Sequence, residues 1–106
     1  MVNSTIINAL QSIAPVYPDF YTAKEKEYIV FTYDISPRLF GDNDAEYDIF
    51  NVRIDYVAPA KQNVIRKRVA IIKALKEIGT YPTEVNASID EYQHYVYENE
   101  MVDVAI

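Results

Sequence analysis

Three acidic residues near the middle of the chain, Asp42, Asp44 and Glu46, have the alternating spacing with which a calcium-binding loop begins. Such a loop also needs a glycine at its sixth position and a bidentate glutamate at its twelfth. This sequence has Tyr47 and Arg53 at those two positions. We therefore expect no metal ion here, and we interpret the acidic stretch as a solvated turn or as a loop that contacts another protein.

The second candidate for chemistry is His94, the single histidine, which lies in the aromatic stretch YQHYVY. A catalytic histidine needs a carboxylate or a nucleophile within hydrogen-bonding reach. The sequence contains no nucleophile-elbow, zinc-protease or glycine-rich phosphate-loop motif. We therefore favour a packed or hydrogen-bonded surface histidine and expect no enzymatic activity and no cofactor. The alternative is a small enzyme that uses His94 together with an Asp or a Glu.

Length and composition restrict the class of protein further. The 106 residues, half of them hydrophobic, fit a single domain that spans residues 1–106. The net charge of −6 disfavours nucleic acids and anionic membranes as partners, because both attract basic surfaces. The chain has no cysteine, which excludes disulfides and cysteine-ligated zinc. The first ten residues lack the charge and apolar core of a secretory signal, so we expect synthesis in the cytoplasm.

The elements expected in the first half of the chain are one helix and two strands. Apolar residues at helical spacing predict a helix over residues 4–14, which Pro15 ends. Residues 28–33 are β-branched and aromatic and predict a strand with bulky side chains on both faces. Strict alternation of apolar and polar residues predicts a second strand over residues 46–59, with one face in the core. Residues 36–45 between these strands are expected to form a long loop.

The second half of the chain predicts a long helix over residues 61–78, with Gly79 as a left-handed cap. Its apolar residues cover about half of the helix circumference, which is wider than one sheet needs. Arg68 and Lys76 fall inside this apolar arc. Their stems either lie along apolar surface with the charges in water, or they form ion pairs with a neighbouring subunit.

Two further strands are expected after this helix, a short one at residues 83–87 and a last one from residue 91. The predicted order is therefore α-β-β-α-β-β. Strands joined by a hairpin pair antiparallel, and both helices then pack on one side of them. We expect an α+β fold with two layers, in which a mostly antiparallel sheet of four or five strands carries two helices on one face.

Two groups of residues are candidates for contacts with other proteins. The candidate loop residues are Arg38, Leu39, Phe40, Asp42, Asp44 and Glu46. The candidate residues of a basic helix face are Arg66, Arg68, Lys73 and Lys76. This helix face is either simply solvated or docks against an acidic neighbour, where opposite charges give orientation and specificity.

Several strings in this order resemble those of the small tail-terminator, or tail-completion, proteins of long-tailed phages and prophages of Gram-positive bacteria. They are IINALQSIAPVY, YIVFTY, SPRLFGD, YDIFNVRIDYVAP, a helix that ends in glycine, and YQHYVYE. Together they span nearly the whole chain. The sequence departs from the family pattern after SPRLF, where relatives often have an Ala-Asp-Asp type of string.

This resemblance implies a non-enzymatic structural protein of the virion, with a mixed sheet and two helices on one face. Such proteins form a homo-oligomeric ring, usually a hexamer, at the head-proximal end of the tail tube. The ring stops polymerisation of the tube and presents a surface to the head–tail connector protein. The resemblance thus implies tail tube protein and connector as partners, assembly in the host cytoplasm and a final location in the virion tail. A head–tail connector or a minor capsid component is the alternative.

Overall fold

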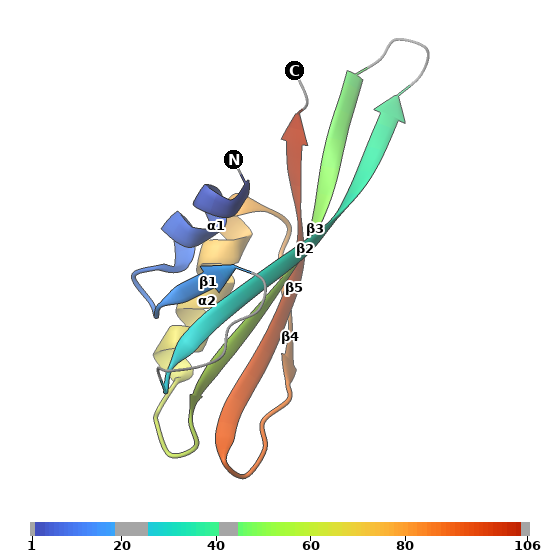
Figure 1. Cartoon of the computed structure of the whole chain (residues 1–106). Coiled ribbons are helices and arrows are strands. Elements are labelled where there is room, and N and C mark those ends of the chain that lie inside the picture. The colour runs from blue at the N-terminus through green and yellow to red at the C-terminus, as the bar shows by residue number, and fades with distance from the viewer. Residues whose placement is uncertain (1, 19–25, 41–44, 105–106) are drawn as a thin grey trace.

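The computed structural model describes residues 2–18, 26–40 and 45–104 and contains two helices and a five-stranded sheet (Figure 1). In chain order the elements are α1 (Val2–Leu10), β1 (Val16–Pro18), β2 (Tyr28–Phe40), β3 (Ala45–Pro59), α2 (Ile65–Ile78), β4 (Thr83–Asn86) and β5 (Tyr92–Val104). The strand order in the sheet is β1-β2-β3-β5-β4. Among the described strands, only β1 pairs parallel with its neighbour. The predicted α+β class and mostly antiparallel sheet are confirmed; the short strand β1 is an addition to the predicted order.

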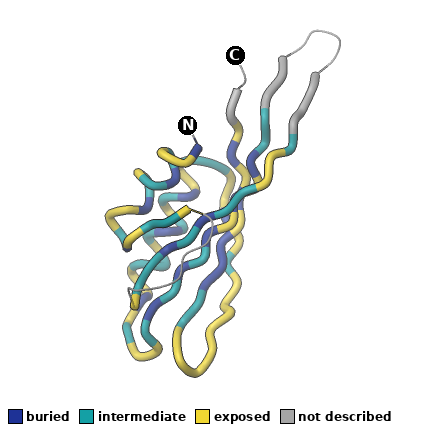
Figure 2. The backbone as a smooth tube through the Cα atoms, in the orientation of Figure 1, coloured by how far each residue is buried: buried dark blue, intermediate teal, exposed yellow. Residues whose placement is uncertain are grey.

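The core lies between the two helices and one face of the sheet (Figure 1). The alternation predicted for the second strand is confirmed, because Phe50, Val52, Ile54 and Tyr56 are all buried. The ladder places Ile54 between Phe31 and Tyr97, and residues paired across a sheet share a face. Figure 2 shows the resulting change between buried and exposed residues along the strands.

Helix α2 begins later than predicted, at Ile65 instead of residue 61. A turn precedes it, in which the Gln62 amide donates to the Pro59 carbonyl at 3.1 Å. The Asn63 side chain then accepts the Ile65 amide at 3.2 Å. The backbone amides of Gln62 and Ile65 thus have local partners in the turn. Local hydrogen bonds of this kind compete with helix formation and delay the start of the helix.

The predicted left-handed cap at Gly79 is wrong, because this residue has extended backbone with φ −169° and ψ −153°. The glycine is needed for space instead. A Cβ atom placed there would lie 2.2 Å from the Glu100 carbonyl oxygen and 2.9 Å from Nδ2 of Asn99. The end of α2 therefore approaches the backbone of β5 more closely than any residue with a side chain allows.

The long loop predicted for residues 36–45 is also wrong. Strand β2 continues to Phe40, β3 begins at Ala45, and the two remain paired up to this last pair. Pro37 is compatible with the ladder because its nitrogen faces away from β3. The Ile29 amide donates to Pro15 on the β1 side, and every second residue of a strand points its backbone groups to the same edge.

The continued hairpin and the end of β5 form a three-stranded arm that extends beyond the helices (Figure 1). We define the arm as residues 34–40, 45–51 and 98–104. The molecule measures 54 × 23 × 22 Å, and its radius of gyration is 15.1 Å. A compact chain of this length has a radius of gyration of about 13 Å. The arm thus makes the molecule elongated and leaves part of its sheet without a helix layer.

Candidate functional site

Four of the six candidate loop residues lie in the strands of the arm. Arg38, Leu39 and Phe40 are in β2, and Glu46 is opposite Leu39 in β3. Asp42 and Asp44 lie outside the described residues. The contact surface that the sequence suggested is therefore the outer part of a paired β-structure, with the regular spacing of strand residues.

The candidate basic helix face is divided in the structure. Arg66 and Lys73 are seven residues apart on α2, both are exposed, and neither forms an ion pair with another described residue. The Lys76 ammonium lies 5.8 Å from the centre of the Tyr81 ring. Arg68 instead turns toward the sheet. Only part of the predicted basic face is thus available to a partner.

Arg68 forms its ion pair within its own chain, with Glu84 of β4. Its Nη2 lies 2.7 Å from Oε1 and its Nε 3.1 Å from Oε2 of that carboxylate, a two-pronged arrangement. The guanidinium carbon also lies 4.1 Å from the centre of the Tyr95 ring. Neither alternative foreseen for Arg68, a charge in water or an ion pair between subunits, describes this contact.

The carboxylate of Glu84 has a second partner, the buried hydroxyl of Tyr97, which donates to it. The hydrogen bonds from Arg68 hold the pKa of Glu84 below its usual value. Burial, together with the anionic partner, raises the pKa of Tyr97. The cluster therefore links α2, β4 and β5 through one ionised carboxylate and one neutral phenol.

A second cluster of the same kind joins Glu27, the residue before β2, to α2 and β3. The carboxylate of Glu27 accepts hydrogen bonds from Tyr56 Oη at 2.5 Å, Gln62 Nε2 at 2.7 Å and Lys67 Nζ at 2.7 Å. Burial alone would raise the pKa of Glu27, but these donors hold it below its usual value. Burial and the carboxylate raise the pKa of Tyr56. The sequence alone does not single out Glu27, because its partners are distant in the chain.

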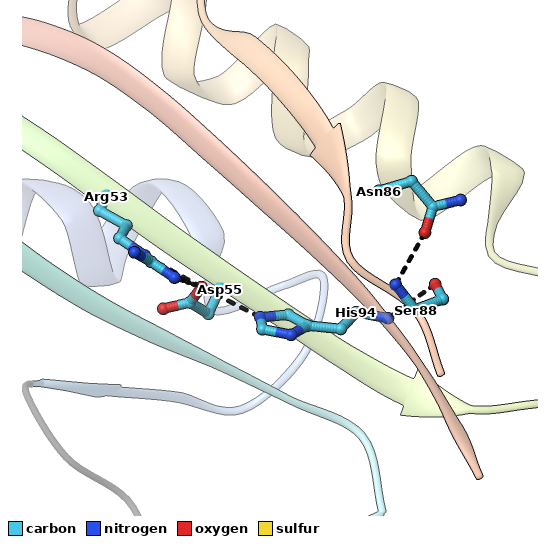
Figure 3. A network of polar contacts seen from close by, with 5 residues as sticks. All are labelled: Arg53, Asp55, Asn86, Ser88 and His94. Carbon is cyan, nitrogen blue, oxygen red and sulfur yellow. Dashed lines mark hydrogen bonds and ion pairs between the residues drawn. The ribbon is translucent and has the colours of Figure 1, made fainter. Parts of the chain in front are cut away.

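His94 lies on the opposite face of the sheet, where Figure 3 shows its contacts. Its Nε2 is 3.0 Å from Oδ1 of Asp55, which also accepts Nε and Nη2 of Arg53 at 3.2 Å. The expectation of a hydrogen-bonded histidine is confirmed. The nearby Ser88 hydroxyl accepts the backbone amide of His94 at 3.0 Å, and the Ser88 amide donates to Asn86 at 2.9 Å. The His94 imidazole is thus paired with the Asp55 carboxylate, whereas the Ser88 hydroxyl is hydrogen-bonded to the backbone of His94.

Neither metal-binding groups, nor membrane-spanning helices, nor known relatives point to a further site in the described residues. Within residues 2–18, 26–40 and 45–104, no group of three or more His, Cys, Asp or Glu residues is placed to hold a metal ion. None of the described helices is long and apolar enough to cross a membrane. No protein-family model matches the chain, and no significant match is found among curated proteins.

Proposed function

We propose that this chain is a structural subunit of a phage tail, a tail terminator that forms a homo-oligomeric ring, expected to be a hexamer. The ring caps the tail tube and joins it to the head–tail connector protein. The ordered sequence strings favour this function over other assembly roles. Among structural observations, the uncovered arm supports it most directly, because a small subunit with a projecting sheet needs neighbours to cover it.

The arm has the surface expected of an assembly element. Ile35 and Val102 on its strands are 54% and 61% exposed. Strand β2 is paired on both sides only as far as Phe31, where β1 ends. Exposed apolar side chains and unpaired strand edges are unfavourable in water and are buried when subunits associate. A ring uses such surfaces on every subunit.

Loss of the protein is expected to leave tail length uncontrolled. In the phage or prophage that encodes it, we expect deletion of the gene to give overlong tubes and heads without tails, visible by electron microscopy. Purified protein added to tail tubes should form a ring at one end of each tube. Normal tails from the deletion strain would contradict the proposal, and labelled protein at the head vertex alone would favour the alternative of a connector or minor capsid component.

Alanine at both Leu39 and Phe40 is expected to weaken assembly without unfolding the subunit. These residues lie in the outer part of the arm, beyond Phe50 and Met101, the last described core residues of β3 and β5 toward the tip of the arm. Apolar anchors of an interface typically contribute 2 kcal/mol or more, so we expect about 30-fold weaker capping of tubes. The measurement is capping titrated by electron microscopy, together with thermal unfolding of the variant.

The matched control is Ile89→Ala, which truncates a residue that is 51% exposed and lies before β5, far from the arm along that strand. It should cap tubes like the wild type. If the Leu39→Ala and Phe40→Ala variant unfolds at a much lower temperature than the control, the pair belongs to the core and the assignment to a contact surface is wrong.

A further inference from the structure

We propose that the groove between α2 and β4 binds the β2 edge of the arm of a second copy of this chain. The two copies associate head to tail, and their sheets become continuous. This inference names the neighbour within the proposed ring and so rests on the proposed function. Four observations carry it: the groove, the unpaired edge of β4, the matching edge of β2, and opposite charges on the two surfaces.

The groove is a hollow of about 190 Å³ with an exposed apolar wall. Ile65 and Val69, one helical turn apart on α2, are 63% and 60% exposed. Arg68, Ile72 and Glu84 complete the lining. Two large aliphatic side chains in water beside a strand form a surface that another strand can cover.

The unpaired edge of β4 lies beside this hollow. The Ala87 amide donates to the His94 carbonyl of β5, and backbone groups of a strand alternate between its two edges. Glu84 and Asn86 therefore point their amides and carbonyls away from β5. No described strand pairs with β4 on that side. Two consecutive outward-facing residues are thus available for a strand from another molecule.

The edge of β2 offers a stretch of the same length. By the same alternation Tyr33 and Ile35 point their backbone groups away from β3, beyond the end of β1. The next outward position is Pro37, which has no amide to donate. The Ile35 side chain lies on the helix-bearing face, because this residue pairs with the buried Phe50. Docking would place it on the same side as Ile65 and Val69.

The directions of the strands agree with this pairing. Because β2, β3, β5 and β4 form a chain of antiparallel neighbours, β2 and β4 run in opposite directions. Two copies in the same orientation therefore bring β2 of one antiparallel to β4 of the other. Their helices then lie on the same side of the joined sheet. After such a head-to-tail contact, one copy still has a free groove and the other a free β2 edge, so the contact can be repeated. Repetition generates a ring when the rotation between neighbouring copies closes.

The charges of the two surfaces identify a second copy as the occupant. Residues 61–78 hold six basic residues and one acidic residue, whereas the arm holds six acidic residues and Arg38 as its single base. Asp34, Glu98 and Glu100 of the arm are exposed. A symmetric contact would join two acidic arms or two basic helices, which like-charge repulsion opposes. Only the head-to-tail contact brings opposite charges together.

Two single substitutions separate the two halves of this interface. Val69→Asp places a charge in the apolar wall of the groove, and Ile35→Pro removes an outward amide while leaving the ladder with β3 intact. Each variant alone should self-associate at least about 30-fold more weakly than the wild type by analytical ultracentrifugation. The matched control Ile35→Val keeps the amide and should associate like the wild type. Circular dichroism checks that each variant is folded.

An equimolar mixture of the two variants gives the decisive result. The intact arm of the Val69→Asp copy fits the intact groove of the Ile35→Pro copy, whereas the other two surfaces are both defective. We therefore expect a 1:1 dimer from two monomeric variants. A wild type that stays monomeric, or a mixture that stays monomeric while the wild type associates, overturns the inference.

Amide hydrogen exchange tests the strand pairing itself. On self-association the amides of Tyr33, Ile35, Glu84 and Asn86 should become protected. Association without this protection means that a different surface is used. All these measurements use purified protein alone. If the Val69→Asp variant still forms rings on tail tubes, the proposed function stands and this interface is rejected. If the two variants form a 1:1 dimer but the wild type does not cap tubes, the interface stands and the proposed function is rejected.

Discussion

Gly79→Ala is expected to lower the free energy of unfolding by about 3 kcal/mol, at the upper end of what overpacking costs. The new Cβ atom would lie 2.2 Å from the Glu100 carbonyl oxygen. Strand β5 cannot simply move away, because that oxygen accepts the Thr80 amide at 2.9 Å. Asn99 also donates to Leu75 at 3.1 Å and to Thr80 at 3.3 Å. For a domain of this size the expected fall in melting temperature is roughly 15 °C.

Gly79→Asn distinguishes the steric explanation from a capping role. Asparagine tolerates the left-handed conformation of a helix cap, so a cap would accept it at little cost. The contact with β5 predicts that asparagine destabilises at least as much as alanine. Glu77→Ala, an exposed position on α2 two residues earlier, serves as the control and should change stability by no more than about 0.5 kcal/mol. Equal melting temperatures for Gly79→Ala and this control would contradict the close approach.

The second large effect is a loss of stability in alkali. Tyr56 and Tyr97 are fully buried, and burial, together with the carboxylates to which both donate, raises their pKa far above the usual value of 10.0. Above pH 10 the unfolded chain releases these protons and the folded chain keeps them. The contribution of these two groups to the free energy of unfolding is therefore fully present below pH 10. Above pH 10 it falls by about 1.4 kcal/mol per pH unit for each tyrosine. Chemical denaturation at several pH values above 10 measures this slope.

Phenylalanine variants isolate the contribution of each buried phenol. Tyr97→Phe and Tyr56→Phe should each remove about half of the alkaline slope, and the double variant should remove most of it. Tyr81→Phe is the matched control, because Tyr81 is 68% exposed and should leave the slope unchanged. A slope that is the same in the double variant and in the wild type would mean that general charge repulsion, and not these two groups, causes the loss.

The elements with a strong local pattern could be predicted from the sequence, and those set by distant contacts could not. Strand β3 was predicted almost to its ends, because one of its faces is buried and the other is exposed along the body of the sheet. The arm was missed, since Pro37 and the acidic stretch that follows are typical of a loop. Only the pairing of the whole β2–β3 ladder shows that this proline faces an unpaired edge.

The two carboxylate clusters were missed for a related reason. Glu27 and Lys67 are 40 residues apart, and Arg68 and Glu84 are 16 residues apart. No local spacing relates such pairs, and each needs the packing of α2 on the sheet to form. His94 was interpreted correctly as a hydrogen-bonded residue, although its partner Asp55 became identifiable only from the register of β3 and β5.

The position of Pro37 also has a consequence for the isolated chain. In a protein without a bound partner, long unpaired strand edges template aggregation. In β2 the outward hydrogen-bonding stretch is closed at one end by β1 and interrupted at the other by a residue without an amide. Only a short stretch of unpaired edge remains on β2, which is too short to bind other chains non-specifically. The same proline that made this part of the strand look like a loop in the sequence thus limits edge-to-edge pairing of the isolated chain.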